Sequence, residues 1–389
     1  AVLIMEDLLK KVEQLNTQDA SEIKPFEHKY KARKLLQNAL QKQTQLIDDA
    51  KNDELKQGEM LNEIMLKYHL GLNYIVCEEN SEGINYLKDV VSYLIKSLKY
   101  RVLYGHILLK SLNNLGIILS NRNELKQAKK YLDQSEQIYR ECENDKNGKI
   151  YKDNLDDNKI EIYGNIRENE YTLTLFYLSQ IYLMMNNQDK SSAYVKKTLQ
   201  RQLLDKDNMD LYEWCRNGIG LSKYYVRVKQ YRQAIHTIEA VSKVAPKFDK
   251  TNDDDCKLEA DLERGWGQLY KNLLKDSYNV MENIKDNSDD TDVKNDSKSN
   301  NVSDTTNLVD LESKLELNND LNMFHGIKLP QPPEMHLCST YNEAKELFKP
   351  GLKHFQNALK YYILNGFVTE HVIINQEISS LYKYIALFE

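Results

Sequence analysis

The chain has 389 residues, a net charge of −6, and only 6 Pro and 14 Gly, which is a helical composition. No stretch reaches the roughly 18 consecutive apolar residues of a membrane span, and no signal-peptide pattern opens the chain. The acidic balance disfavours nucleic acid as the main partner. The five cysteines are widely spaced without a CxxC pair, so we expect reduced thiols and a cytoplasmic protein.

The first expected elements are two helices. A weak helix is expected over Met5–Leu15, and Pro25-Phe26-Glu27 begins a stronger one. The apolar residues of this second helix, Leu36 and Leu40 among them, recur at helical spacing.

Four helical hairpins that read like tetratricopeptide repeats follow. In each, a leucine precedes a small residue, and twelve positions later a second small residue lies on the next helix. The four pairs are Leu70-Gly71 with Gly83, Leu115-Gly116 with Ala128, Leu178-Ser179 with Ser191, and Leu221-Ser222 with Ala234. The small residues allow the two helices of a hairpin to approach closely, and Pro246 is expected to end the last one.

The spacing of these hairpins predicts an irregular solenoid. The leucines are 45, 63 and 43 residues apart, whereas a tetratricopeptide repeat takes about 34. We therefore predict an all-α, tetratricopeptide-like solenoid of antiparallel helix pairs with long loops over residues 1–285. Repeats of this kind build binding surfaces, which favours a scaffold.

The remainder of the chain divides into a polar loop and a helical end. Residues 286–322 are acidic and rich in Asp, Asn and Ser, which predicts disorder, with a short helix possible over Leu308–Leu317. Residues 323–389 carry two further helices, near Tyr341–Tyr362 and Val368–Leu387, with a kink or break expected at Pro350-Gly351. The last helix has an apolar face without a capping helix, so we expect a longer natural chain.

No catalytic or metal-binding pattern is present in the sequence. It holds no phosphate-binding loop, nucleophile elbow or HExxH spacing, and its eight histidines are scattered. We therefore expect neither an enzyme, nor a cofactor, a metal or a small-molecule substrate.

Helical geometry indicates which residues face a partner. On the third hairpin, Tyr177 and Gln180 point away from the stripe of Leu178 and Tyr182. Tyrosine is enriched at interfaces, although Tyr177 could instead pack against a neighbouring helix. Equivalent positions on the second and fourth hairpins are Asn114 and Ile117, and Gly220 and Lys223.

The sequence also resembles the KIF-binding (kinesin-binding) protein family, collinearly across nearly its whole length. The residues that carry this resemblance include Pro25-Phe26, His69-Leu70-Gly71, Asn113-Asn114-Leu115-Gly116-Ile117, Tyr177-Leu178, Arg201-Gln202-Leu203, Glu213-Trp214, Gly366-Phe367-Val368-Thr369 and Phe388-Glu389.

The resemblance implies an α-helical solenoid that holds kinesin motor domains off microtubules, and so controls cargo transport, microtubule organisation and axonal outgrowth. It also implies that Tyr177, Gln180 and Gln202 lie on the concave, motor-binding side. The chain departs from the family near Gly220, where the family carries a threonine. The alternative hypothesis is a general co-chaperone that clamps peptide tails, for which the mixed surface of Asn114, Ile117 and Lys223 is poorly suited.

Overall fold

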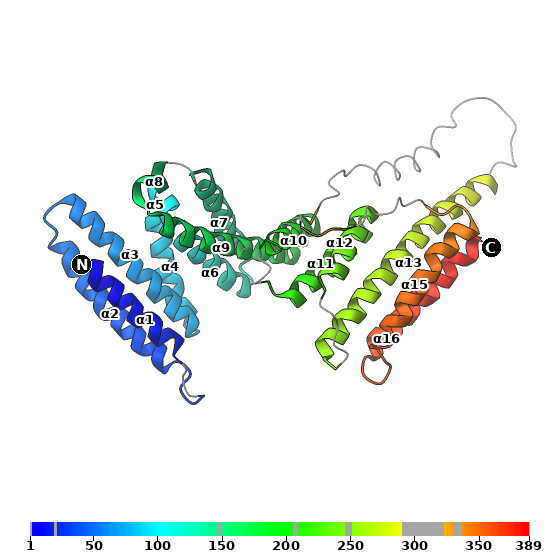
Figure 1. Cartoon of the computed structure of the whole chain (residues 1–389), viewed down its shortest axis with the longest axis horizontal. Coiled ribbons are helices and arrows are strands. Elements are labelled where there is room, and N and C mark those ends of the chain that lie inside the picture. Colours follow the sequence, from blue (N-terminus) through cyan, green and yellow to red (C-terminus); the bar gives the residue numbers. More distant parts are fainter. Residues whose placement is uncertain are drawn as a thin grey trace, which may run out of the picture. The chain divides into compact units, whose positions relative to one another are not determined.

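The computed structural model describes residues 2–18, 22–145, 149–204, 209–245, 251–289, 323–324, 326–329 and 337–388. These residues form helices and short turns, and none of them is in a strand (Figure 1). The all-α prediction is therefore confirmed, while the assignment to the tetratricopeptide type stays an interpretation. The chain divides into two compact units, Ala1–Tyr194 and Val195–Glu389, each described below by itself.

The first unit is built from helices that pack against their neighbours in the chain. Each of α2, α3 and α4 packs against the preceding helix, and α6 packs against α4, α7 and α9. The helices are α1 (Val2–Thr17), α2 (Glu27–Asp48), α3 (Asp53–Val76), α4 (Asn80–Leu94), α5 (Leu98–Leu103), α6 (Gly105–Asn121), α7 (Leu125–Asp145), α8 (Lys149–Asn154), α9 (Asp157–Met184) and α10 (Gln188–Gln202), the last of which continues into the second unit.

The four predicted hairpins are present as the helix pairs α3–α4, α6–α7, α9–α10 and α11–α12. In the first, second and fourth of these pairs the small residues lie at the helix crossing. A Cβ atom added to Gly116 would lie 2.7 Å from Leu132 Cγ, and one added to Gly71 would lie 2.7 Å from Leu87 Cδ2. At the fourth crossing the Ser222 hydroxyl donates to the carbonyl of Ala234. The predicted close approach of the two helices is confirmed at these crossings.

The four hairpins also share one turn geometry, which the sequence did not indicate. A residue with positive φ follows each first helix, eight positions after the repeat leucine: Glu78, Asn123, Asn186 and Lys229. The N–H of the next residue donates to the carbonyl five residues earlier, as from Glu124 to Leu119. This is the Schellman pattern, which satisfies carbonyls at the helix end.

Stacked tyrosines join neighbouring helices of the first unit. The rings of Tyr139 on α7 and Tyr171 on α9 lie 3.7 Å apart and nearly parallel. Tyr182 and Tyr194 stack between α9 and α10, with their ring centroids 5.5 Å apart. Many of the 26 tyrosines are thus packing residues rather than surface ones.

In the second unit, helix α13 packs against all four other long helices, and the core contains the buried side chains of Trp214 and Phe324. The helices are α11 (Leu211–Arg227), α12 (Tyr231–Val244), α13 (Asp253–Asp289), α15 (Tyr341–Ala358) and α16 (Val368–Ile385), followed by a short 3-10 helix (Ala386–Phe388).

The division into units differs from the domain boundaries expected at residues 285 and 323. Helices α13 and α15, which lie on either side of the expected loop, pack together within one unit. Residues 286–289 continue α13, whereas residues 290–322, with the expected helix Leu308–Leu317, lie outside the described residues, as does Pro246.

Of the kink or break expected at Pro350-Gly351, the break is wrong, because α15 continues through both residues, while the kink stays a prediction. Its start is fixed by a capping box in which Thr340 and Glu343 satisfy each other's backbone N–H groups. Gly351 is buried where a Cβ would lie 3.0 Å from Tyr270 Cβ on α13. Tertiary packing on α13 therefore outweighs the local preference of proline to end the helix.

Candidate partner-binding site

The residues expected to face a partner in the first unit are half-buried. Tyr177 packs against the cluster of Leu119, Leu178 and Ile181, and its ring lies edge-on to Phe176. Tyr177 therefore packs against a neighbouring helix, which was the alternative to a partner-facing position. Gln180 is half-buried one turn further along α9. Contact of either side chain with a partner stays a prediction.

On α6, Asn114 and Ile117 are also half-buried. The Asn114 amide donates to the carbonyl of Lys110, so it is bound within its own helix. The neighbouring Asn113 is fully buried: its amide nitrogen donates to the Glu170 carbonyl, and its oxygen accepts from the Thr174 hydroxyl at 2.8 Å. Asn113 is therefore a packing residue that ties α6 to α9.

The other candidates lie in the second unit. Gln202, the last residue of α10, is half-buried, and its side-chain oxygen has no hydrogen-bond partner among the described residues. Gly220 is exposed, and a Cβ added to it would meet nothing within 4 Å, so the threonine of the family pattern would fit there. Tyr177 and Gln180 belong to the first unit, and Gln202 belongs to the second. That these residues share one concave face stays a prediction.

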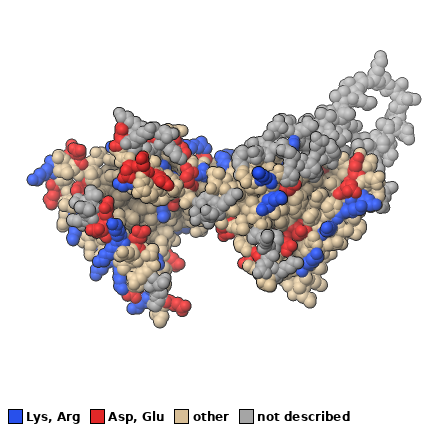
Figure 2. Space-filling view, in the orientation of Figure 1, with Lys and Arg blue, Asp and Glu red and all other residues tan. Residues whose placement is uncertain are grey.

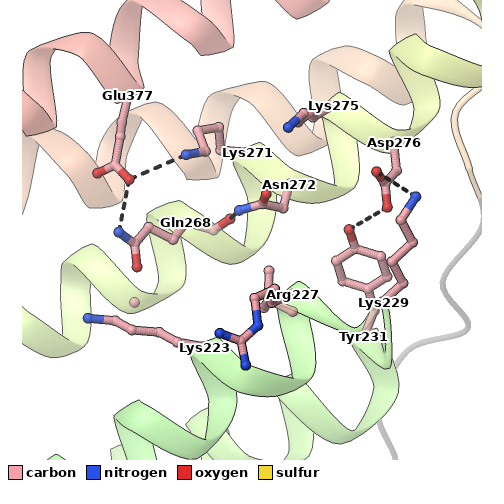
Figure 3. Close-up of a pocket in the computed structure, with 12 residues that line it drawn as sticks. Lys223, Arg227, Lys229, Tyr231, Gln268, Lys271, Asn272, Lys275, Asp276 and Glu377 are labelled. Atoms are coloured by element: carbon pink, nitrogen blue, oxygen red, sulfur yellow. Dashed lines mark hydrogen bonds and ion pairs between the residues drawn. The ribbon is translucent and has the colours of Figure 1, made fainter. Parts of the chain in front are cut away.

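Lys223 is the predicted residue with the most informative surroundings. It lies on α11 and lines a hollow of about 300 Å³ between α11, α13 and α16 (Figure 3). Five cationic side chains and two carboxylates line this hollow, which we call the basic hollow. Elsewhere, acidic and basic side chains are interspersed over the visible face of each unit (Figure 2).

Both carboxylates of the basic hollow are held by fixed partners. Glu377 on α16 accepts from Gln268 at 2.8 Å and forms ion pairs with Lys271 at 3.3 Å and Arg264 at 3.5 Å. Asp276 on α13 accepts from the Tyr231 hydroxyl at 2.8 Å and pairs with Lys229 at 3.1 Å.

Three cations of the basic hollow have no such partner. Within the part of the chain that the structure describes, no carboxylate forms an ion pair with Lys223, Arg227 or Lys275. Burial by the surrounding atoms lowers the pKa of Lys223 and the nearby Arg264 lowers it further, while Asp261 and Glu377 offset only part of this shift. The hollow is therefore electropositive and has unused capacity for anions.

The sequence reasoning found Lys223 but missed Arg227, Lys271 and Lys275. The available signal was the i, i+4 spacing of Lys223 with Arg227 and of Lys271 with Lys275, which places each pair on one helix face. Such pairs are common on solvated helices, and only the packing of α11 beside α13 brings the two pairs together.

Metal binding and membrane insertion find no support in the described part of the chain. None of its helices is both long and apolar enough to cross a bilayer. Nor do three His, Cys, Asp or Glu side chains gather there in a way that could hold a metal ion.

Known proteins resemble this chain over most of its length. The family described as KIF-1 binding protein C terminal matches residues 212–389, which include α11 to α16. The KIF-binding protein of Xenopus tropicalis is 27% identical over 354 residues, covering 84% of this chain. The chain is similar to the KIF-binding proteins. The resemblance noted in the sequence is thereby confirmed.

Two further relatives extend the match toward both ends of the chain. The KIF-binding protein of Gallus gallus is 27% identical over 388 residues, covering 95% of this chain, and that of Danio rerio is 26% identical over 437 residues, covering 98%. The matches span 56%, 64% and 68% of the Xenopus, Gallus and Danio proteins. No solved structure matches the chain.

Proposed function

We propose that this chain binds kinesin motor domains as a non-enzymatic adaptor and inhibitor. The observation that carries the proposal is the similarity, over 84% to 98% of the chain, to proteins named for binding KIF. An all-α set of packed hairpins supports it, because such arrays present extended binding surfaces.

The proposed mechanism is steric competition. A bound scaffold covers the motor surface that faces the microtubule, so that the motor cannot hold scaffold and lattice together. The chain would act in the cytoplasm at the cytoskeleton, where it would limit cargo transport and affect microtubule organisation and axonal outgrowth. Gln180 and Gln202, which are half-buried, and Lys223, which is exposed, are the proposed contact residues.

The alternative is a co-chaperone that binds peptide tails, and one observation favours it. The basic hollow offers cations that could clamp a terminal carboxylate. Against it, Asn114 is bound to its own helix and Ile117 is apolar, so these two positions of α6 do not offer the polar groups that such a clamp needs. A clamp that relies on ion pairs loses affinity steeply as salt rises.

Microtubule co-pelleting with a panel of kinesin motor domains tests the proposal. We expect the chain to move at least one motor from the pellet to the supernatant, since scaffold and microtubule compete for one surface. If every motor pellets equally with and without the chain, the proposed inhibition is wrong. Peptide tails that bind while no motor does would favour the alternative.

A substitution at Gln180 locates the contact. Because Tyr177 packs in a cluster, replacing it would disturb the fold, whereas Gln180 is outside that cluster. We expect Gln180→Arg to weaken motor binding about tenfold, which corresponds to about 1.4 kcal/mol and is typical of a central interface residue. Gln127→Arg, an equal charge change at an exposed glutamine of α7, is the control. Equal affinities for both variants would place the contact elsewhere.

A further inference from the structure

We propose that the basic hollow binds an acidic peptide segment whose carboxylates pair with Lys223, Arg227 and Lys275. The proposal rests on the proposed function only in taking a kinesin as the protein that carries the segment. The acidic character of the segment is inferred from the basic hollow alone.

The spacing of the cations fits an extended acidic chain. Lys223 and Arg227 are one helical turn apart on α11, and Lys271 and Lys275 are one turn apart on α13 (Figure 3). Four residues of helix span roughly 6 Å. Alternate residues of an extended chain lie roughly 6.6 Å apart on the same side. A segment with acidic residues at alternate positions therefore matches the spacing of Lys223 and Arg227, and Lys275 on α13 is available to a further carboxylate.

Part of the positive charge of the basic hollow is not neutralised by ion pairs within the described chain. Glu377 forms ion pairs with Lys271 and Arg264, and Asp276 forms one with Lys229. The cations with which a ligand could pair are therefore Lys223, Arg227 and Lys275. The Lys223 side chain is reached by solvent, yet the surrounding atoms and Arg264 disfavour its charged form more than the nearby Asp261 and Glu377 favour it. An incoming carboxylate would offset that cost, so the site gains more from an anion than an open surface would.

The basic hollow suits several carboxylates better than a single phosphate. Phosphate sites in proteins commonly use free backbone N–H groups at helix starts or in loops. Gln268, Lys271 and Glu377 lie in the interiors of α13 and α16, where N–H groups are held within the helix. Side chains from two helices must then supply the binding, which suits several separated charges better than one compact anion.

Arg227 has a second role that the test must allow for. It lies in the last turn of α11, where a cation offsets the helix dipole, and its guanidinium lies 5.5 Å from the ring centre of Tyr224. The test therefore changes residues on both helices, and its control removes the same charge from the same unit.

The experiment measures fluorescence anisotropy of a labelled peptide of alternating glutamate and serine, added to the full chain. We expect binding that weakens with salt and is absent for the glutamine version of the peptide. In the triple variant Lys223→Gln, Arg227→Gln, Lys275→Gln, the affinity should fall at least about tenfold, because each exposed ion pair contributes a few-fold.

The matched control is Lys257→Gln, Lys349→Gln, Lys353→Gln, which removes three exposed cations that do not line the basic hollow. Equal loss of affinity in both triple variants would mean general charge attraction and would overturn the proposal. So would binding of a phosphoserine peptide of equal charge without binding of the glutamate peptide.

Motor binding, measured in parallel, separates this inference from the proposed function. If the peptide binds in the basic hollow but no motor is retained, the inference holds and the proposed function fails. If motors bind equally to both triple variants and the peptide does not bind, the inference fails and the proposed function stands.

Discussion

Gly116 shows how much of this fold depends on the absence of a single methyl group. Its Cα faces Leu132 across the α6–α7 crossing, and a Cβ there would lie 2.7 Å and 2.9 Å from two atoms of that leucine. Leu132 is fully buried, so it has no room to move aside.

We expect Gly116→Ala to destabilise the chain by about 1–3 kcal/mol, as overpacking of a tight crossing does. Gly58→Ala is the control, because Gly58 is exposed on α3 with nothing within 4 Å of an added Cβ. That change should stabilise the chain by up to about 1 kcal/mol, since alanine favours helix over glycine. Urea unfolding followed by circular dichroism measures both, and a neutral Gly116→Ala would mean that the crossing can widen.

Individual residues also mark the limit of sequence reasoning. The helical wheel placed Tyr177 and Gln180 off the leucine stripe, and both side chains are half-buried whereas Leu178 is fully buried. It could not show that Tyr177 packs in a cluster that includes Leu119 of α6, because that contact joins residues far apart in the sequence. Their role toward a partner stays a prediction.

At the level of elements, the contact between α6 and α9 includes a histidine held in its neutral form. The ring of His106 stacks on Tyr163 with 4.0 Å between ring centres, and its Nδ1 is buried without a partner in the described structure. Burial, and secondarily the nearby Arg167, lowers the pKa of His106 from 6.5 to about 3.

This histidine should make the chain less stable in mild acid. Below pH 6.5 the unfolded chain gains a proton at residue 106 that the folded chain does not accept until about pH 3. Its stability contribution is therefore complete above pH 6.5 and is lost progressively as the pH falls. At about pH 5 the loss is about 2 kcal/mol.

His106→Phe tests this, because phenylalanine can keep the stack on Tyr163 but cannot titrate. We expect the variant to lose about 2 kcal/mol less than the parent between neutral pH and about pH 5, measured by urea unfolding at each pH. Parallel pH dependence of the two proteins would show that His106 takes up its proton normally in the folded state.

The hairpins themselves were predictable, and their turns were not. Leu70, Leu115, Leu178 and Leu221 are all buried, as the repeat pattern requires. The turn residues of the first and last hairpins are Glu78 and Lys229, which have no preference for positive φ. The helix ends impose that conformation on them, so a turn prediction based on Gly or Asn misses both.

At the level of the whole molecule, each unit has its own hydrophobic clusters. Leu112 belongs to the main cluster of the first unit, whereas Leu269 belongs to that of the second. Both tryptophans of the chain, Trp214 and Trp266, lie in the second unit. Tryptophan fluorescence therefore reports on the second unit, while circular dichroism reports on both.

We expect Leu112→Ala to remove about 2–5 kcal/mol from the first unit, because it leaves a cavity at a fully buried position. The thermal transition seen by circular dichroism should then begin at a lower temperature, with the tryptophan transition unchanged. Leu269→Ala should instead lower the tryptophan transition. Equal shifts of both signals in either variant would mean that the chain unfolds as one cooperative unit.

The division into units was beyond the reach of the sequence for a physical reason. The composition of residues 286–322 suggested a domain boundary. Helices α13 and α15 on either side of it nevertheless share one hydrophobic core, to which α13 contributes Leu274 and α15 contributes Phe355. A polar insertion between two packed helices has the same composition as a linker between two domains. Only the contact between α13 and α15 distinguishes an insertion from a linker. In the same way, only the contact between α11 and α13 shows that their two pairs of cations line one hollow.

The stacked tyrosines of the first unit have a consequence for how its packing can be observed. Parallel phenol rings a few ångströms apart, as in the pair Tyr139–Tyr171, couple their electronic transitions and are close enough to be joined as dityrosine by photo-oxidation. The two tryptophans of the chain lie in the second unit, so their bands should stay constant when only the first unit loosens. Loss of the phenol signal in near-ultraviolet circular dichroism, with helix content retained, would report helices that have separated without melting.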